Sequence, residues 1–265
     1  MPNHPITPAV SILMPVRNEE RFLPAALDSI SRQTLQTWEL IAVDDGSTDA
    51  TPTILAAAAE ADPRIRVLST NGQGLVPALN MGLAACCAPL VARMDGDDIS
   101  HPARLAEQAT FLAGNGDVGL VACSFRHFPC HAVGSGMAAY EQWQSRLMDH
   151  DAIMTDRCVE SPFVHPSVMF RRSCVEAVGG YRDRGWPEDY DLWLRLAAAG
   201  TDHPYQPLLY AGCVSPLQAP PPATGIPGRG TAGEAGRRRQ GGEGLVPDPA
   251  RRGHRGGGVG GRGPA

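Results

Sequence analysis

Continuous apolar runs alternate with helical segments along the first half of the chain, and this alternation constrains its fold most. The first run is AVSILMPV at residues 9–16, and the segment after it repeats apolar residues at helical spacing from Phe22 to Ile30. Unbroken apolar runs of this length are typical of strands that are buried on both faces of a sheet. Strands that alternate with helices predict a parallel sheet with right-handed connections.

Later segments continue the same pattern. We expect further strands in WELIAVDDGSTD, RIRVLST, PLVARMD and DVGLVAC, and a strand followed by a helix in SPFVHPSVMFRRSCVEAVGGY. Further helices are expected after an N-cap at Asp49 and in GLVPALNMGLAACC, ARLAEQATFLAGNG and WPEDYDLWLRLAAAG, with a mixed helical region at 136–160. The predicted fold class is α/β, with a Rossmann-like, mostly parallel sheet flanked by helices in a single domain.

The chain of 265 residues divides by composition into three parts. Residues 1–8 are an N-terminal extension, and residues 9–212 are long enough for one large domain. The tail at 213–265 differs, because the last 50 residues contain 15 Gly, 8 Pro and 8 Arg and almost no large apolar groups. Such a segment cannot bury enough surface to fold. We expect it to be disordered or translated from a shifted reading frame, with an Arg/Gly RNA-binding tail as a third interpretation.

Charge and composition exclude several function classes. The net charge is −5, yet the last 50 residues carry 8 Arg against 3 acidic residues, so the body that precedes them is strongly acidic. An acidic body is unsuited to binding nucleic acid through its phosphates. All 23 basic residues are Arg. Without lysine the chain is neither a P-loop nucleotide-binding protein nor a Schiff-base enzyme.

Cysteine usage and hydropathy bear on the location of the protein. Seven cysteines occur without C-x-x-C spacing, which favours free thiols in a reducing compartment. A metal site that combines His127 with Cys130 or His131 is the alternative. We find neither a signal peptide nor an apolar run long enough to span a membrane. We therefore expect a cytoplasmic protein, with peripheral attachment to the inner face of the plasma membrane left open.

Polar residues directly follow three of the predicted strands. They are Arg17-Asn18-Glu19, Asp44-Asp45-Gly46-Ser47 and Asp95-Gly96-Asp97-Asp98. Because ligands of parallel sheets bind at the carboxyl ends of the strands, we expect these residues to line one site.

The D-G-D sequence that begins at Asp95 indicates the chemistry of this site. Residues two apart in an extended segment project to the same side, so Asp95 and Asp97 can face one ligand while Gly96 allows a close backbone approach. Carboxylate oxygens suit Mg²⁺ or Mn²⁺, and Mg²⁺ commonly joins one or two carboxylates to substrate phosphates. A solvated acidic turn is the alternative for this sequence taken alone.

Six segments in register resemble the family 2 glycosyltransferases of the GT-A fold. They are SILMPVRNEERFLPAALDSI, ELIAVDDGSTDATPTIL, GLVPALNMGL, ARMDGDDISHPARL, HPSVMFRR and WPEDYDLWLRLA, and they cover about residues 9–199. The resemblance implies a nucleotide-sugar-binding half at 9–100 and an acceptor-side half at 101–212. The chain departs from the family pattern at Arg17, where an aromatic residue is frequent, and follows it only loosely after Gly200.

On the donor side, the resemblance implies that one segment lines the nucleotide pocket: Pro15, Val16, Arg17, Asn18 and Glu19. Asp45, helped by Asp44, would hold the base or ribose of a nucleoside diphosphate sugar. A helix-capping turn through Ser47 and Asp49 is the alternative for these two carboxylates.

The resemblance also assigns the residues around the acidic loop. Asp95 would sit near the ribose, and Arg93 would be one of the residues that bind the nucleotide. Asp97 would ligate Mg²⁺ or Mn²⁺ on the diphosphate, with Asp98 in support.

For the transfer step, the resemblance places the catalytic base in the pair Glu188-Asp189, and Asp189 is the better candidate. Its carboxylate would take the proton of an acceptor hydroxyl, and attack opposite the leaving group would invert the anomeric configuration. Helix capping is the alternative for this pair. Trp186 would stack on a sugar ring or belong to the core, and His165 would contact the diphosphate or acceptor or be a structural histidine.

The expected function is an inverting, metal-dependent glycosyltransferase of bacterial cell-surface polysaccharide or glycolipid synthesis. Its donor would be a nucleoside diphosphate sugar, with UDP-sugars foremost, and its acceptor a sugar or a lipid-linked sugar; nucleic acid is not an expected partner. A non-catalytic nucleotide-sugar-binding protein or an inactive truncated remnant is the alternative. A nucleotidyltransferase also uses Asp pairs and a metal, but its Gly-rich loop with a basic signature is missing.

Overall fold

The computed structural model describes residues 7–199 and 208–211. All of these residues belong to the first of two units into which the chain divides, Met1–Ala219 and Pro220–Ala265. The Gly/Pro/Arg-rich tail and all but two residues of the predicted N-terminal extension lie outside the described residues.

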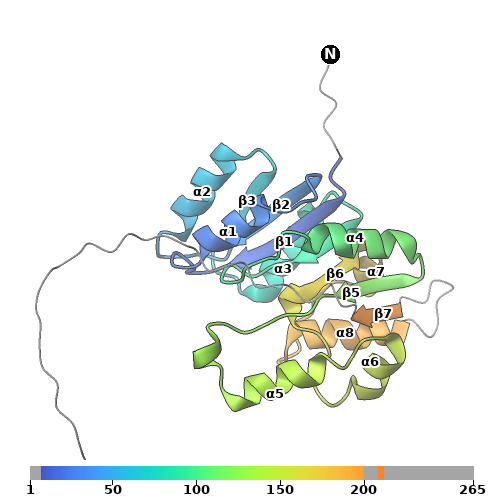
Figure 1. Cartoon of the computed structure of the whole chain (residues 1–265). Coiled ribbons are helices and arrows are strands. Elements are labelled where there is room, and N and C mark those ends of the chain that lie inside the picture. Colours follow the sequence, from blue (N-terminus) through green and yellow to red (C-terminus); the bar gives the residue numbers. More distant parts are fainter. Residues whose placement is uncertain (1–6, 200–207, 212–265) are drawn as a thin grey trace, which may run out of the picture. The chain divides into compact units, whose positions relative to one another are not determined.

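The described part is built on one seven-stranded sheet (Figure 1). In chain order the strands are β1 (Val10–Val16), β2 (Trp38–Asp44), β3 (Ile65–Ser69), β4 (Leu90–Arg93), β5 (Val118–Ala122), β6 (Val168–Arg171) and β7 (Leu208–Ala211). Across the sheet they follow the order β3-β2-β1-β4-β6-β5-β7. Strands β1 to β4 are parallel, β6 runs antiparallel to both β4 and β5, and β7 is parallel to β5. The predicted mostly parallel α/β sheet is confirmed, with β6 reversed.

Helices fill the connections as the apolar spacing predicts. They are α1 (Leu23–Ser31), α2 (Thr51–Ala61), α3 (Leu75–Ala85), α4 (Arg104–Gly114), α5 (Ser135–Gln144), α6 (His150–Asp156), α7 (Arg172–Ala177) and α8 (Glu188–Ala199). The predicted N-cap at Asp49 is wrong by one residue, because α2 is preceded by Ala50. The Asp49 carboxylate still accepts a hydrogen bond from the Thr51 amide at 3.0 Å, so it stabilises the start of the helix from one position earlier.

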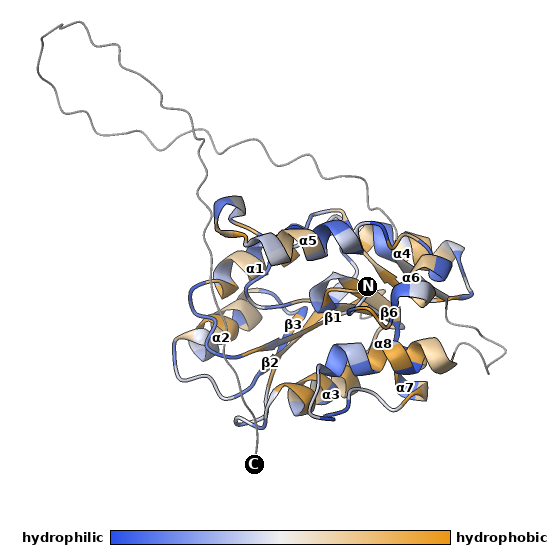
Figure 2. Cartoon of the chain, turned by 90° about the horizontal axis from the view of Figure 1, so that it is seen from below, coloured by the Kyte–Doolittle hydropathy of each residue, from blue (hydrophilic) through white to orange (hydrophobic). Residues whose placement is uncertain are grey.

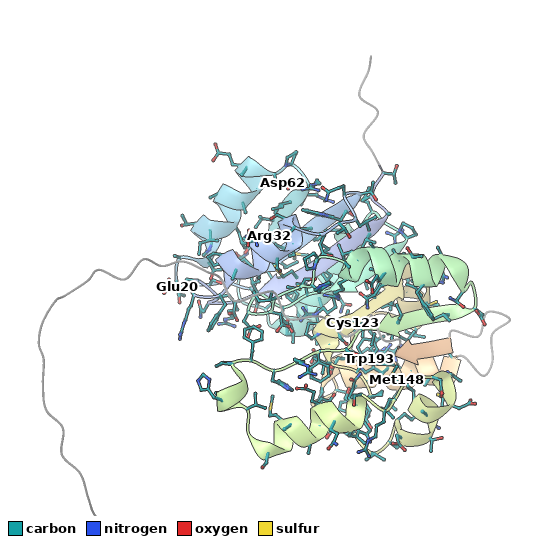
Figure 3. The ribbon with its side chains drawn as sticks, viewed as in Figure 1. Glu20, Arg32, Asp62, Cys123, Met148 and Trp193 are labelled. Atoms are coloured by element: carbon teal, nitrogen blue, oxygen red, sulfur yellow. The ribbon has the colours of Figure 1, made fainter. Side chains whose placement is uncertain are left out.

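Two hydrophobic cores lie on opposite faces of the sheet (Figures 1 and 2). Alternate residues of β1 pack in different cores. Ile12 and Met14 lie in the core formed with α1, α2 and α4. Leu13 lies in the core formed with α3, α7 and α8. Strands that are buried on both faces explain why the strand sequences are continuously apolar. Trp193 of α8, labelled in Figure 3, is buried, whereas the polar residues Glu20 and Arg32 labelled there are exposed.

The sheet order brings the predicted site segments together. Strands β2, β1 and β4 are adjacent and parallel, so their carboxyl ends open at the same edge. The backbone pairing continues into the loops, where the amide of Asp45 donates to the carbonyl of Val16 at 2.9 Å and the amide of Met94 donates to that of Leu13 at 3.1 Å. Within the ranges described above, no helix combines the length and apolarity needed to cross a membrane.

Candidate active site

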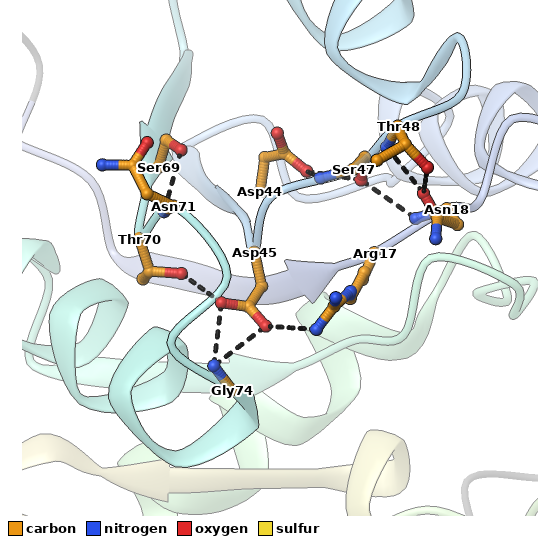
Figure 4. A network of polar contacts seen from close by, with 10 residues as sticks. All are labelled: Arg17, Asn18, Asp44, Asp45, Ser47, Thr48, Ser69, Thr70, Asn71 and Gly74. Carbon is orange, nitrogen blue, oxygen red and sulfur yellow. Dashed lines mark hydrogen bonds and ion pairs between the residues drawn. The ribbon is translucent and has the colours of Figure 1, made fainter.

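The loop after β1 is tied to the loop after β2 by hydrogen bonds between side chains and backbone. Asn18, in the left-handed conformation at φ 57°, accepts from the Thr48 amide through Oδ1 at 2.8 Å, and its own amide donates to Ser47 Oγ at 2.9 Å (Figure 4). The Glu19 amide donates to Thr51 Oγ1 at 2.8 Å. The two loops therefore present one connected rim above the strand ends.

Asp45 lies in this rim as a buried, hydrogen-bonded carboxylate. The Gly74 amide donates to both of its oxygens at 3.0 Å, Thr70 donates its hydroxyl, and the exposed Arg17 guanidinium lies 3.4 Å away (Figure 4). Burial raises the pKa of this carboxyl, but the hydrogen bonds from Thr70 and Gly74 and the charge of Arg17 outweigh it, so the pKa is lowered. Asp45 is thus an ionised acceptor at the carboxyl end of β2.

Asp44 has a different environment. Its Oδ1 accepts from both the amide and the hydroxyl of Ser47, which closes a local turn (Figure 4). This contact matches the turn alternative for Asp44. Asp45 instead receives hydrogen bonds from Thr70 and Gly74 in the loop after β3 and from Arg17 in the loop after β1.

The acidic loop after β4 is anchored by a buried arginine. Arg93 is 2% exposed, and its Nη2 lies 2.6 Å from Asp95 Oδ1. Gly96 has no room for a side chain, since a Cβ would approach Val16 Cγ1 to 2.8 Å and Glu19 Cγ to 3.2 Å. At Gly96 the loop after β4 therefore packs closely against the loop after β1. This contact places Glu19 beside the acidic loop.

Negative charge is concentrated at this loop. Burial, followed by the charges of Asp95 and Asp97, raises the pKa of Asp98 to about 6. Burial and the same two carboxylates raise the pKa of Glu19. Four carboxyl groups from two loops thus repel one another at the edge of the sheet.

Two buried arginines beneath the loop offset part of this charge. Arg104 of α4 donates from Nη2 to the carbonyls of Arg93 at 2.7 Å and Val168 at 3.2 Å, and no ion pair to it is recorded in the described part of the chain. The charges of Arg93 and Arg104 both oppose the rise in the Asp98 pKa. They do not cancel it, so the loop remains electrostatically suited to a cation.

The residues present fit one kind of metal site and not another. Among residues 7–199 and 208–211, no group of three or more His, Cys, Asp or Glu side chains is placed to hold a metal ion. A cation enclosed by protein ligands alone does not fit. A Mg²⁺ or Mn²⁺ ion held by one or two carboxylates together with substrate oxygens does fit, because Asp97 is exposed and the oxygen donors are of the right type.

A second group of predicted residues lies at the start of α8. Glu188 Oε1 is 3.4 Å from His165 Nδ1, and His165 Nε2 is 3.0 Å from the Tyr181 hydroxyl. Burial raises the pKa of Asp189, whereas the contact with His165 lowers the pKa of Glu188. The Arg93 charge lowers the pKa of His165 in addition to burial, so this group adjoins the acidic loop.

Other predicted residues are placed as follows. Pro15 and Val16 are buried in β1, and Val16 belongs to the core. Trp186 is 49% exposed, so the core alternative for it is wrong. Two arginines of the segment HPSVMFRR, for which no site role was predicted, have structural contacts. Arg171 donates to three backbone carbonyls between the end of α4 and the start of β5, and Arg172 lies 3.6 Å from Glu176.

The structure also qualifies the metal alternative at His127. His127 Nδ1 lies 3.4 Å from Glu141 Oε2, and no group of three or more metal-binding side chains includes it among the side chains that the structure describes. The side chain of Cys130, the other half of that alternative, lies outside them. Five cysteines are recorded as free: Cys86, Cys87, Cys123, Cys158 and Cys174. Cys213 lies outside the described residues.

Comparison with known proteins identifies the family. The profile described as Glycosyl transferase family 2 matches residues 11–179. The chain belongs to glycosyl transferase family 2. The family match covers both loops of the donor side and His165, while the pair Glu188-Asp189 lies beyond its end.

Relatives with curated names agree with this membership. The putative glycosyltransferase EpsE of Bacillus subtilis strain 168 is 34% identical over 204 residues, which are 73% of this chain and 68% of EpsE. A UDP-Gal:alpha-D-GlcNAc-diphosphoundecaprenol beta-1,3-galactosyltransferase of Escherichia coli is 30% identical over 197 residues, which are 73% of this chain and 70% of that protein.

Solved structures share the fold of this family 2 chain. Crystallised S. aureus TarS has a TM-score of 0.59 at 18% identity, with 78% of this chain and 58% of the TarS chain covered. The mannosyltransferase PcManGT of Pyrobaculum calidifontis, in complex with GDP-Man and Mn²⁺, has a TM-score of 0.55 at 23% identity, with 78% and 57% covered. The chain thus spans less than two thirds of these structures' lengths.

Three residues of the site were not singled out in the sequence. Thr70 and Gly74 follow β3, a strand whose end carries no charged residue, and Tyr181 follows two glycines after α7. The positive φ of Gly74, 100°, is the conformational reason for a glycine there, and a Gly just before an apolar helix is the one signal that the sequence offered.

Proposed function

We propose that this chain is an inverting glycosyltransferase that moves a sugar from a nucleoside diphosphate sugar to an acceptor hydroxyl in bacterial cell-surface polysaccharide or glycolipid synthesis. The observation that carries the proposal is the buried Arg93. It pairs with Asp95 on the donor side, and its charge reaches His165 and Glu188 beside the candidate base. On this proposal, the donor and acceptor sides of the site would meet around the Arg93 side chain.

On the donor side, each residue has a task that its environment suits. Asp45, held ionised and with an oxygen that faces Arg17, would accept hydrogen bonds from the base or ribose. Asp97, with Asp98 in support, would hold Mg²⁺ or Mn²⁺. When bound, the cation would offset negative charge that develops on the departing diphosphate. A UDP-sugar is the donor that we expect first.

On the acceptor side, Asp189 would take the proton. The O–H electron pair of the acceptor would form the new bond to the anomeric carbon, while the proton moves to the Asp189 carboxylate. The bond from the anomeric carbon to the diphosphate oxygen would break, and its electron pair would leave with the diphosphate. A raised pKa suits Asp189 to this task, because a stronger base accepts the proton more readily.

A donor panel tests the proposal. The full chain is incubated with Mn²⁺ and radiolabelled UDP-, GDP- and dTDP-sugars, with and without sugar and lipid-linked acceptors. Release of the nucleoside diphosphate with transfer or hydrolysis of the sugar is the expected result. Binding without turnover would instead support a nucleotide-sugar-binding protein, and pyrophosphate release would support a nucleotidyltransferase.

A further inference from the structure

The two neighbouring carboxyl groups at the start of α8 have different partners. Glu188 faces the His165 ring, with 3.4 Å between Oε1 and Nδ1. Asp189 accepts a hydrogen bond from the Tyr190 amide at 2.7 Å, and no side chain donates to it within the described residues. The pair is therefore asymmetric: one carboxylate is held by a side chain and the other is held by backbone alone.

The ring that holds Glu188 is itself fixed from several sides. His165 is 8% exposed, packs edge-on against the Trp193 ring and contacts the Tyr181 hydroxyl through Nε2 at 3.0 Å. Asn80 of α3 clamps the backbone of Tyr181: it accepts from the Tyr181 amide at 3.0 Å and donates to the Tyr181 carbonyl at 2.9 Å. Helices α3 and α8 and the loop that carries Tyr181 thus set the position of one imidazole.

The hydrogen-bond partners fix where the protons lie. Burial and the charge of Arg93 lower the pKa of His165, so the ring is neutral and has one N–H and one lone pair. An ionised Glu188 only accepts, which assigns the N–H to Nδ1. Nε2 must then accept from the Tyr181 hydroxyl. The titratable and charged groups that act on this ring are Arg93, Asp95, Tyr181, Glu188 and Asp189.

We propose that Tyr181 and His165 are positioning residues that hold Glu188 as a hydrogen-bonded carboxylate, so that Asp189 alone receives the proton of the acceptor hydroxyl. This inference rests on the proposed function. It assigns His165 no contact with the diphosphate or the acceptor, and it gives Glu188 an electrostatic task. The fixed charge of Glu188 adds to burial in keeping the pKa of Asp189 above its ordinary value.

A pair of tyrosine variants separates positioning from general stability. Tyr181→Phe removes the hydroxyl that donates to His165. Tyr140→Phe, the control, removes a hydroxyl that donates to the Ser161 carbonyl at 2.9 Å and leaves the histidine alone. We expect kcat of Tyr181→Phe to fall about 3- to 10-fold, the rate equivalent of one hydrogen bond, with the donor KM unchanged. We expect Tyr140→Phe to keep kcat and KM.

The pH profile is the readout that a merely structural role would not move. Without Tyr181's hydroxyl, His165 is free to change tautomer and Glu188 loses its donor, so the pKa of Glu188 rises and Glu188 competes with Asp189 for a proton. The acid limb of kcat/KM should therefore shift to higher pH in Tyr181→Phe. Glu188→Gln removes the negative charge beside Asp189 and should shift the limb to lower pH. These two opposite shifts, with none in Tyr140→Phe, support the proposal.

Replacements of the histidine give a second, independent arm. His165→Asn keeps an amide N–H donor near the position of Nδ1, whereas His165→Leu removes the donor. The His165→Asn variant should therefore retain a higher kcat than the His165→Leu variant. In the unmodified protein, ¹⁵N NMR of the imidazole should show a neutral ring protonated at Nδ1. An Nε2–H tautomer, or a Tyr181→Phe variant that matches Tyr140→Phe in both kcat and pH profile, would overturn this inference alone. If the unmodified protein transfers no sugar from any donor, the proposed function falls as well.

Discussion

The guanidinium of Arg93 lies 2.6 Å from the carboxylate of Asp95, and the arginine is almost completely buried. This pair explains how an acidic loop can follow a buried strand, because a cation beneath the loop compensates the first of its carboxylates. Arg93 Nε has no hydrogen-bond partner among the described atoms, so the pair with Asp95 and the contact with the Met94 carbonyl are what its guanidinium relies on. Removing one partner leaves a buried charge without compensation.

We predict that Asp95→Asn destabilises the fold by about 1.5–3 kcal/mol, the range for a hydrogen bond to a charged group. Urea unfolding of the full chain measures this change. Asp28→Asn is the matched control, because Asp28 pairs with Arg32 at 2.8 Å on an exposed helix surface, and such pairs contribute about 0–1 kcal/mol. An equal loss in the free energy of unfolding of the two variants would show that the buried Arg93–Asp95 pair stabilises the fold no more than an exposed ion pair does.

The donor-side loops could be predicted from the sequence because a parallel sheet brings successive strand ends to one edge. Asp45 follows β2 directly, and Asp95 and Asp97 lie in the loop that follows β4, so strand alternation alone places them at the same edge. The individual roles could not be predicted in this way. Asp44 and Asp45 are adjacent in sequence, yet one closes a turn with Ser47 and the other binds Gly74.

The contacts around His165 could not be predicted from the sequence, for a different reason. His165 precedes β6, which runs opposite to its neighbours, and Tyr181 and Glu188 lie on separate segments after it. Their meeting depends on how α8 packs against the sheet and on the clamp from Asn80, which lies 101 positions from Tyr181 in the chain. No local pattern encodes a contact between segments so far apart.

Asp97→Ala should weaken binding of a nucleotide sugar in the presence of Mn²⁺ by at least about tenfold, the effect of losing one charged contact. Because Asp97 is exposed, we expect the free energy of unfolding to stay within about 0.5 kcal/mol of the parent. Isothermal titration calorimetry measures the affinity, with Glu60→Ala, an exposed acid of α2, as the control. Equal affinity of the Asp97 and Glu60 variants would remove Asp97 from the metal site.

Asp189→Asn should abolish transfer and leave donor binding intact. The amide has nearly the shape of the carboxylate but cannot take a proton, and general-base catalysis typically contributes about 10²- to 10⁴-fold. Single-turnover transfer and calorimetry with the same donor measure the two properties separately. Transfer at the parental rate would show that the base is another group.

The pH dependence of stability tests whether His165 is held neutral. The folded protein lowers the pKa of His165 below the ordinary value of 6.5, so the unfolded chain binds a proton there that the folded chain does not. Stability is therefore lost as the pH falls below 6.5, at a slope of at most about 1.4 kcal/mol per pH unit. Asp98 acts in the opposite sense, because its raised pKa of about 6 lets the folded protein take up a proton first.

Comparison of the parent with His165→Asn isolates the histidine, since the contribution of Asp98 is common to both proteins. The free energy of unfolding of the parent should exceed that of His165→Asn by less at pH 5 than at pH 7, as measured by urea unfolding at each pH. Glu188 acts only in a lower range, because its pKa is moved down from 4.5. His131→Asn, at an exposed position, is the control and should run parallel to the parent. If the free energies of unfolding of the parent and His165→Asn differ by the same amount at every pH, the folded protein does not hold this ring neutral. The assigned proton positions would then be wrong.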